Sequence, residues 1–200
     1  MFPIAPGLAG VLQFIYPRLP VACGVLAITT LILYLSWIDR LISLDPLTGL
    51  NNRKQLTHFY ETWLRSHNEG DRLFTLLIDA NKFKHINDTY GHIQGDNALK
   101  NIAEALRISC KSMPKRANIA RYGGDEFAVI FEADSLEEAE KLKECIKQRL
   151  AEVNVRTHVP FELTVSIGIA DSEGKMTLKE LIDAADEQMY NEKRGKNAAN

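Results

Sequence analysis

The feature that most constrains the fold is an apolar run over residues 73–78, with the sequence LFTLLI. A strand with one face in water alternates apolar and polar side chains, but this run is apolar almost throughout. It is therefore predicted to be a strand that is covered on both faces. Asp79 follows it directly, and a carboxylate at the end of a buried strand is costly to desolvate unless a partner compensates its charge.

From residue 45 onward, segments with helical periodicity alternate with segments that favour strands. Helices are expected from residue 51 or 52 to about 66, from about 95 onward, over 135–153 and over 177–192, and strands over 73–78, 119–122, 126–131 and 161–170. The helix start signals are Asn51 or Asn52 as a cap, and capping boxes that pair Ser135 with Glu138 and Thr177 with Glu180. This order predicts a sheet with helices packed on it, of the α/β or α+β class.

The N-terminal part of the chain has a different composition. Arg18 is the one charged residue in positions 1–38, and residues 19–38 form an uncharged run. A helix of that length spans roughly 30 Å, the thickness of the hydrocarbon core of a bilayer. The sequence therefore predicts a transmembrane helix over about 19–38, with a buried core helix as the alternative. Residues 1–44 would form this membrane segment and a short linker, and residues 45–197 a folded domain.

Charge and cysteine content exclude two classes of function. The chain has 24 Lys and Arg against 26 Asp and Glu, without a basic cluster or tail, so binding to a nucleic-acid polymer is not expected. Cys23, Cys110 and Cys145 are scattered and form no CxxC pair, which argues against a disulfide framework or a zinc site.

A second acidic feature lies at residues 123–126. Gly123 and Gly124 allow a tight hairpin and the close approach of a ligand, and the carboxylates of Asp125 and Glu126 follow. A hairpin beside the strand that ends at Asp79 would bring these acids together, and clustered carboxylates suit Mg²⁺ with substrate phosphates in its shell. For this motif alone, a solvated turn rich in Gly and Asp is the better interpretation.

The residues around position 90 add polar groups of other kinds. Lys84 follows the acidic strand end and suits phosphate oxygens. Asn87 and Asp96 offer an amide and a carboxylate, which together can recognise the hydrogen-bonding edge of guanine. Ordinary turn and cap chemistry explains the same residues at least as well. Lys193 and Lys196 suit phosphates too, but cations are also favoured at the C-terminus of any helix.

Taken in order, these motifs resemble the GGDEF-domain family of diguanylate cyclases. The resemblance covers about residues 45–197. It rests on DPLTGLNNR at 45–53, DANKFKHIND at 79–88, GHIQGD at 91–96, RYGGDEF at 121–127, SIGIA at 166–170 and ADEQMY at 185–190. It implies a nucleotide-cyclase, palm-like fold whose central, mostly antiparallel sheet is flanked by helices. It also implies an enzyme that condenses two GTP molecules into cyclic di-GMP and two pyrophosphates.

The resemblance further implies roles for individual residues around the metal. Mg²⁺, or Mn²⁺ in its place, would be held by Asp79, the backbone carbonyl of Ala80, and Asp125. Glu126 would lie near the metal and the reacting hydroxyl, as base or as ligand. Gly123 and Gly124 would let the nucleotide lie against the hairpin.

For the substrate, the resemblance implies that Asn87 and Asp96 select guanine. Phe83 (through its backbone), Lys84 and Lys193 would contact the triphosphate, with Lys196 as a further candidate. Each domain of this family holds one GTP, so a homodimer with facing sites is implied. With the predicted helix, this places the enzyme at the bacterial inner membrane, its catalytic domain in the cytoplasm. Arg40, Arg53 and Lys54 after the uncharged run favour the same orientation.

Two alternatives remain at this point. An inactive GGDEF domain could serve as a GTP-binding or protein-interaction module, although such domains usually lose motif residues that are present here. Another purine-nucleotide cyclase or a polymerase-palm relative would share the carboxylate chemistry, but the set of motifs argues against a palm.

The chain departs from the family pattern at three places. Asn81 stands where a second Asp is common, and the motif after Lys193 is one residue shorter than usual. Many relatives carry an Arg-x-x-Asp element that binds the product as an inhibitor, and residues 114–117 here are PKRA. Both key side chains of that element are missing, which predicts that the product does not inhibit through this site.

Overall fold

The computed structural model describes residues 11, 14–16, 21–41, 43–68, 70–111, 113, 116–172 and 177–198, and the side chains of residues 21, 22, 39–41 and 196–198 are outside this description. The chain divides into two compact units, Met1–Ser43 and Leu44–Asn200. Each unit is described by itself.

The N-terminal unit contains one long helix, α2 (Val21–Leu41). The hydroxyls of Thr29 and Thr30 donate to the carbonyls of Val25 and Leu26, at 2.6 and 2.8 Å. Within the described part of the chain, no helix is both long and apolar enough to cross a membrane, so the transmembrane helix predicted over residues 19–38 is not supported.

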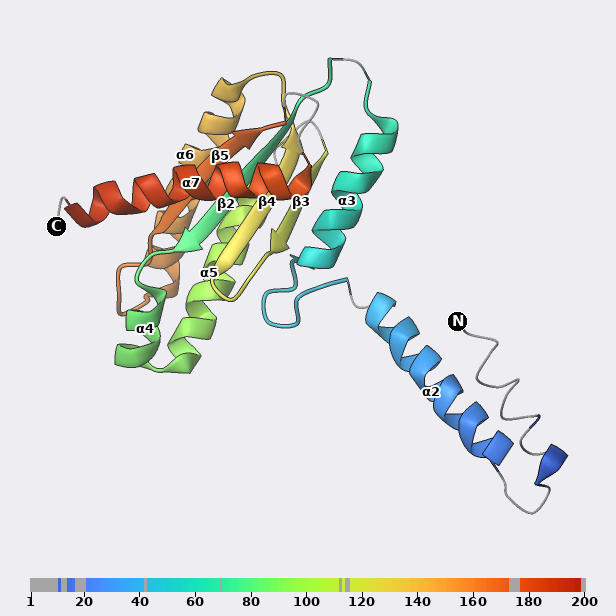
Figure 1. The fold of residues 1–200 in the computed structure, drawn as a ribbon. Helices are drawn as coiled ribbons and strands as arrows, with labels where there is room; N and C mark the ends of the chain where they lie inside the picture. Colours follow the sequence, from blue (N-terminus) through green and yellow to red (C-terminus); the bar gives the residue numbers. More distant parts are fainter. Residues whose placement is uncertain are drawn as a thin grey trace. The chain divides into compact units, whose positions relative to one another are not determined.

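The second unit is built on a five-stranded sheet with the order β1-β3-β4-β2-β5 (Figure 1). The strands are β1 (Asn51–Asn52), β2 (Leu73–Ala80), β3 (Ala117–Arg121), β4 (Glu126–Glu132) and β5 (Val165–Asp171). Among the strands that the structure describes, the short β1 pairs in parallel with β3, and the other pairs are antiparallel. The predicted mostly antiparallel sheet is thus confirmed, as is the prediction that β2 is buried along its whole length.

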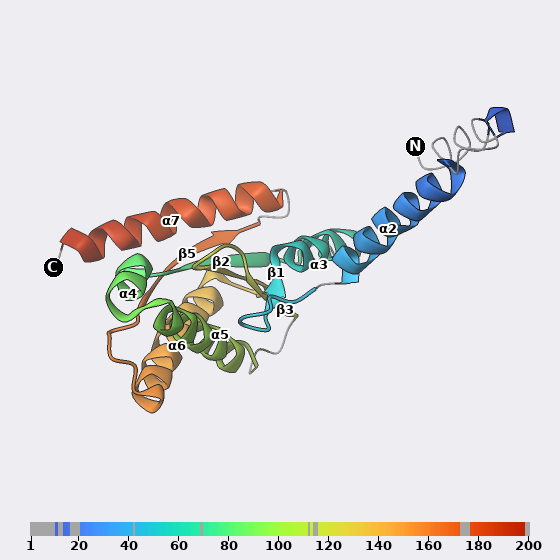
Figure 2. The ribbon, with the colours of Figure 1, turned by 90° about the horizontal axis from the view of Figure 1, so that it is seen from below.

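Helices cover both faces of the sheet. They are α3 (Arg53–Ser66), α4 (Phe83–Tyr90), α5 (His92–Lys111), α6 (Leu136–Thr157) and α7 (Leu178–Ala198). Helices α5 and α6 lie on one face, and α3 and α7 lie on the other (Figure 2). The second unit is therefore an α+β domain with the sheet as its middle layer.

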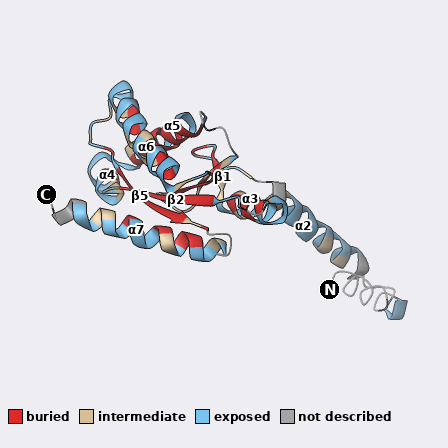
Figure 3. Cartoon of the chain, turned by 90° about the horizontal axis from the view of Figure 1, so that it is seen from above, coloured by how far each residue is buried: buried red, intermediate tan, exposed pale blue. Residues whose placement is uncertain are grey.

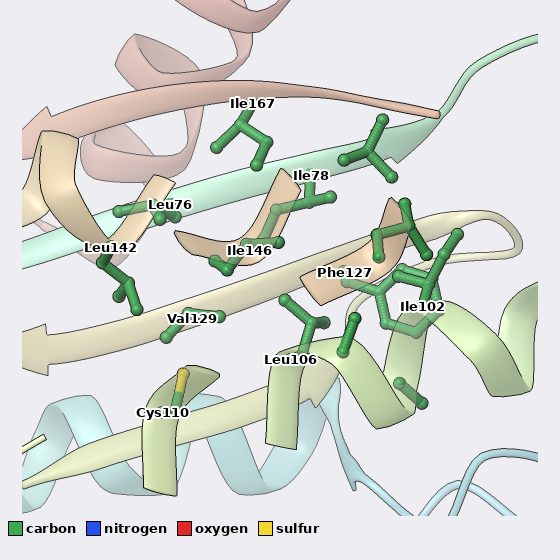
Figure 4. Packing of buried hydrophobic residues seen from close by; sticks show 14 of the residues in the cluster. Leu76, Ile78, Ile102, Leu106, Cys110, Phe127, Val129, Leu142, Ile146 and Ile167 are labelled. Carbon is green, nitrogen blue, oxygen red and sulfur yellow. The ribbon is translucent and has the colours of Figure 1, made fainter. Parts of the chain in front are cut away.

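Alternation along β2 divides the core into two clusters. Phe74, Leu76 and Ile78 pack toward α5 and α6. Figure 4 shows Leu76 and Ile78 on that side of the sheet. Leu73 and Leu77 pack toward α3 and α7. Because a side chain in a strand points to the face opposite that of its neighbour, the odd-numbered Asp79 belongs to the face of α7.

Two of the three predicted helix caps are confirmed. The side-chain oxygen of Asn52 accepts from the backbone N–H of Gln55, and Thr177 and Glu180 form the reciprocal bonds of a capping box. The predicted box at Ser135 is wrong, because its hydroxyl makes no capping bond and Glu138 accepts from the backbone of Asp134 instead.

Element boundaries differ from the predictions where tertiary contacts compete with the local pattern. Helix α4 was not expected, and α5 begins at His92, earlier than predicted. Strand β5 begins at Val165 instead of 161, because the ring of Phe161 packs on Tyr90, with ring centroids 5.2 Å apart, outside the sheet. An apolar residue can thus satisfy the strand pattern while it packs against the end of a helix.

Candidate active site

Two acidic side chains face each other where β2 and β4 meet. Asp79 pairs directly with Glu126 in the antiparallel register, and both belong to the face that α7 covers. Directly opposed residues in such a pair have their Cβ atoms about 4.5–5.5 Å apart. The backbone N–H of Ala80 donates to the carbonyl of Asp125 at 3.3 Å, so Asp125 also lies beside the end of β2. The fold therefore brings the predicted acidic residues together.

The Gly-Gly turn is closed by its own backbone. The N–H groups of Tyr122 and Gly123 both donate to the carbonyl of Glu126, at 2.8 and 3.1 Å. A Cβ on Gly123 would come within 2.5 Å of a carboxylate oxygen of Glu126, whereas a Cβ on Gly124 would meet nothing within 4 Å. A side chain at position 123 would therefore displace the carboxylate of Glu126 from its place over the turn.

Arg121 is a residue whose role the sequence did not reveal. Its guanidinium donates to the carbonyl of Gly124 through two nitrogens, at 3.1 and 2.6 Å. A third nitrogen lies 3.1 Å from the carboxylate of Asp45, which also accepts from the backbone and hydroxyl of Thr48. Arg121 therefore ties the Gly-Gly turn to the first turn of the domain. Arg121 and Asp45 both belong to motifs of the sequence, but they come together only in the folded chain.

Replacing Arg121 by Ala is expected to lower the free energy of unfolding by about 1–3 kcal/mol at pH 7, because the largely buried Asp45 loses its counter-charge. Burial raises the pKa of Asp45, but the hydrogen bonds from Thr48 and the charge of Arg121 outweigh burial and hold the pKa below its usual value. A lowered carboxyl pKa gives stability that is present above the unfolded pKa of about 3.9 and lost as the pH falls.

The difference between wild type and Arg121→Ala should therefore shrink as Asp45 becomes protonated. Urea unfolding at pH 7 and near pH 3 measures this difference in the free energy of unfolding. Arg121→Lys is the matched control, because it keeps the charge without the forked geometry, and it should lose less. A difference that does not change between the two pH values would contradict the role given to this pair.

The acidic cluster carries an excess of negative charge. Burial, above all, raises the pKa of Asp79, which is 8% exposed, and the carboxylates of Asp125 and Asp186 raise it further, whereas Lys193 lowers it. Burial and the neighbouring acids also raise the pKa of Glu126. The ammonium of Lys193 lies 2.6 Å from a carboxylate oxygen of Asp79. The excess of negative charge thus favours a cation at this place, and the ammonium of Lys193 on α7 supplies one.

The donors at this place fit Mg²⁺ in their chemistry. They are carboxylate and carbonyl oxygens, and neighbouring carboxylates raise the pKa of Asp79 and of Glu126, which a divalent ion would relieve. Among the described residues, no group of three or more His, Cys, Asp or Glu side chains is arranged to hold a metal. Mg²⁺ commonly uses one or two carboxylates plus substrate phosphates, so such a group is not required. Asp79, Ala80 and Asp125 remain the predicted ligands.

A cavity of about 830 Å³ opens beside the acidic cluster. Its lining includes the predicted residues Ala80, Phe83, Lys84, Asp125 and Lys193. The volume lies within the range of about 300–1,000 Å³ that is typical of small-molecule sites. Three lysines, Lys82, Lys84 and Lys193, and the end of β2 thus border one space that is large enough for a nucleotide.

The two predicted guanine-binding residues lie elsewhere. Asn87 is in α4, and its side-chain oxygen lies only 1.9 Å from where a Cβ on Gly95 would be. Asp96 follows Gly95 in α5 and is exposed, so the two residues are neighbours. Neither belongs to the described lining of the cavity. The side chain of Lys196, the further candidate for phosphate, is outside the described residues.

Asn81, the departure from the family pattern, has a structural task. Its side-chain amide donates to the hydroxyl of Thr164 at 3.0 Å and accepts from the hydroxyl of Ser166 at 2.8 Å. Its backbone N–H donates to the carbonyl of Thr164 at 2.9 Å. Because Thr164 lines the cavity, Asn81 fastens one wall of the cavity to the end of β2.

A buried acid on a central strand, a second acid on a Gly-Gly hairpin and a lysine-lined cavity are typical of α+β domains that act on nucleotides. Residues 42–199 match the family model described as diguanylate cyclase, GGDEF domain. The chain belongs to this family.

Similar proteins support the assignment. The chain is 38% identical over 152 residues to diguanylate cyclase DgcP of Pseudomonas aeruginosa, covering 75% of this chain and 22% of that protein. It is 38% identical over 150 residues to diguanylate cyclase DgcM of Escherichia coli, covering 74% and 35%. The chain thus spans only about a fifth to a third of the length of these relatives.

A solved structure has the same fold. It contains the coiled coil and GGDEF domain of DgcB from Caulobacter crescentus in complex with c-di-GMP, and it superposes with a TM-score of 0.65 at 27% identity. The superposition covers 88% of this chain and 93% of the DgcB chain. The GGDEF-like α+β fold that the motifs predicted is therefore confirmed.

Proposed function

We propose that this chain is a diguanylate cyclase, which condenses two GTP molecules into cyclic di-GMP and two pyrophosphates. The observation that carries the proposal is the opposed pair Asp79 and Glu126, with Lys193 paired to Asp79 at 2.6 Å beside the cavity. The names of the relatives DgcP and DgcM support the same activity.

The chain's own residues bind and orient the substrate. Lys84 and Lys193 border the cavity and are suited to pair with the oxygens of the triphosphate. Lys193 would exchange its bond to Asp79 for a phosphate when GTP enters. Mg²⁺, held by Asp79, Asp125 and the carbonyl of Ala80, would supply neutralisation of the phosphate charge. Asn87 and Asp96 would select guanine.

The reaction itself needs a base and a correctly placed second nucleotide. The 3′-hydroxyl oxygen of one GTP attacks the α-phosphorus of the other, and pyrophosphate leaves in line. Burial raises the pKa of Glu126, which makes its carboxylate a stronger base, suited to accept the hydroxyl proton. Each domain would hold one GTP, so we propose a homodimer with two facing sites. Because GTP is supplied inside the cell, the proposal places the domain in the cytoplasm, and its attachment to the inner membrane stays a prediction of the sequence.

One incubation tests the proposal. The chain is mixed with GTP and Mg²⁺, and the products are separated by chromatography. Cyclic di-GMP is expected, with two pyrophosphates for each product and a specific activity that rises with protein concentration. A parallel incubation with ATP should give no cyclic product, which separates this function from that of other purine-nucleotide cyclases. GTP that is bound but left intact would favour the alternative of an inactive, GTP-binding regulatory domain.

The product is expected not to inhibit the enzyme through the site that many relatives use. Ala117 is the first residue of β3 and carries no carboxylate, and residues 114 and 115 lie outside the described part of the chain. Added cyclic di-GMP should leave the initial rate unchanged. The double variant Pro114→Arg with Ala117→Asp should acquire inhibition. Calorimetry with the wild-type chain checks this expectation. Tight binding of cyclic di-GMP that neither GTP nor its analogues displace would refute it.

A further inference from the structure

The buried contacts of α7 end before the helix reaches the active site. Its buried side chains are Leu181, Ile182, Ala185 and Met189, all of which pack on the sheet. Beyond Met189, none of the side chains that the structure describes in α7 is buried (Figure 3). The last part of the helix therefore needs other contacts to hold its position.

Lys193 lies in this weakly packed part of the helix. Its ammonium contacts Asp79 at 2.6 Å and thereby brings a positive charge from α7 to the acidic cluster. That contact must loosen when the lysine turns to a phosphate, so it cannot hold the helix end while substrate is bound. Arg194, the next residue, stacks over Tyr190 on the same helix and gives no anchor to the sheet.

Glu192 supplies an anchor from the other helix layer. One of its carboxylate oxygens lies 2.8 Å from the ammonium of Lys143, and the other lies 3.3 Å from that of Lys147. Both lysines belong to α6, which packs on the opposite face of the sheet from α7. The two ion pairs thus join the two helix layers, and both helices contact the edge strand β5.

Burial makes these ion pairs stronger than ordinary surface pairs. The side chains of Lys143 and Glu192 are only 17% and 18% exposed. An exposed pair contributes little, because water and salt screen it, whereas a largely desolvated pair in which both carboxylate oxygens are used is costly to break. The surface pair Glu137 and Lys141 on α6, at 77% and 71% exposure, offers a comparison within the same helix.

We infer that Glu192 is a positioning residue for the nucleotide site. Held by Lys143 and Lys147, it fixes the end of α7 so that Lys193 faces Asp79 and the cavity. This inference rests on the proposed use of GTP. It makes the affinity for the triphosphate depend on two lysines of α6 that do not line the described cavity.

The test compares Glu192→Gln with Glu137→Gln, which removes the exposed ion pair on α6. Loss of the anchor should raise the KM for GTP about 5- to 50-fold and change kcat less than about twofold, since a misplaced binding group weakens substrate binding. Glu137→Gln should change neither constant. The swap Glu192→Lys with Lys143→Glu should recover part of the lost affinity, which a general effect on folding would not do.

Direct binding separates this inference from the proposed activity. Calorimetry with a non-hydrolysable GTP analogue needs no turnover, and hydrogen exchange of residues 190–195 reports the order of the helix end. For Glu192→Gln, the dissociation constant of the GTP analogue should rise, and the amide hydrogens of residues 190–195 should exchange faster. Equal affinities would overturn the inference even if the enzyme is active, and a wild-type chain that binds no analogue would overturn both. Should Glu192→Gln fail to fold, Lys143→Gln repeats the comparison with Lys147 still in place.

Discussion

Replacing Glu126 by Gln is expected to abolish the formation of cyclic di-GMP while making the domain more stable in the absence of divalent ions. Asp79 and Glu126 are directly opposed on β2 and β4, and like charges in such a pair are destabilising by about 0.2–1 kcal/mol. Glutamine removes one of these charges at nearly the same size. Loss of the proposed base should lower turnover by about 10²- to 10⁴-fold.

The gain in stability should depend on pH. Burial and the neighbouring carboxylates raise the pKa of Glu126 in the folded domain. Between the unfolded and folded pKa values the native state binds more protons, so the contribution of Glu126 to stability falls as the pH rises. The advantage of Glu126→Gln should therefore be largest near pH 8 and vanish near pH 4, where the acid is neutral.

Thermal unfolding in a chelating buffer at these two pH values measures this effect. Glu132→Gln on the same strand is the matched control, because Glu132 pairs with Leu73 instead of an acid. It should change neither stability nor turnover. A Glu126→Gln domain that is less stable than the wild type at pH 8, or that still forms product at the normal rate, would refute the role of this pair.

Replacing Gly168 by Ala is expected to cause the largest loss of stability among glycine-to-alanine changes at the described glycines of this domain. A Cβ at this position would lie 1.8 Å from the carbonyl oxygen of Ala185 and 2.5 Å from the backbone nitrogen of Met189. Backbone atoms cannot move aside as a flexible side chain can. Helix α7 must therefore lift from β5, and we expect the free energy of unfolding to fall by about 3–5 kcal/mol.

Urea unfolding, compared with that of Gly195→Ala, checks this expectation. Gly195 lies on the same helix with nothing within 4 Å of its added Cβ, and alanine there should change stability by less than about 1 kcal/mol, in the stabilising direction. Because α7 also carries Lys193, Gly168→Ala should weaken the binding of GTP. Equal urea midpoints for Gly168→Ala and the wild type would show that α7 does not pack closely against this glycine.

The parts of the fold that were predicted correctly depend on short stretches of chain. The apolar run of β2, the Gly-Gly hairpin and the caps at Asn52 and Thr177 each arise from neighbouring residues. Hydrophobic periodicity and capping are local effects, so the sequence alone can specify them. Ser135 marks the limit of this approach, because its capping signal is present but Glu138 bonds to Asp134 instead.

The missed features depend on residues that are far apart. Arg121 and Asp45 are 76 positions apart, Ser166 and Asn81 are 85 apart, and Lys193 and Asp79 are 114 apart. No periodicity relates such residues, and only the register of the strands and the placement of α7 bring them together. The two-residue strand β1 was missed for the same reason, because it exists only through its parallel pairing with β3.

Motifs and local periodicity thus suffice to assign the family, the buried central strand and the acidic residues of the site. How the site is held depends on the fold. It opposes Asp79 to Glu126, ties the Gly-Gly turn to Asp45 through Arg121, and anchors the end of α7 through Glu192. The physical reason is that burial and charge pairing depend on distances across the folded chain, which the order of residues does not contain.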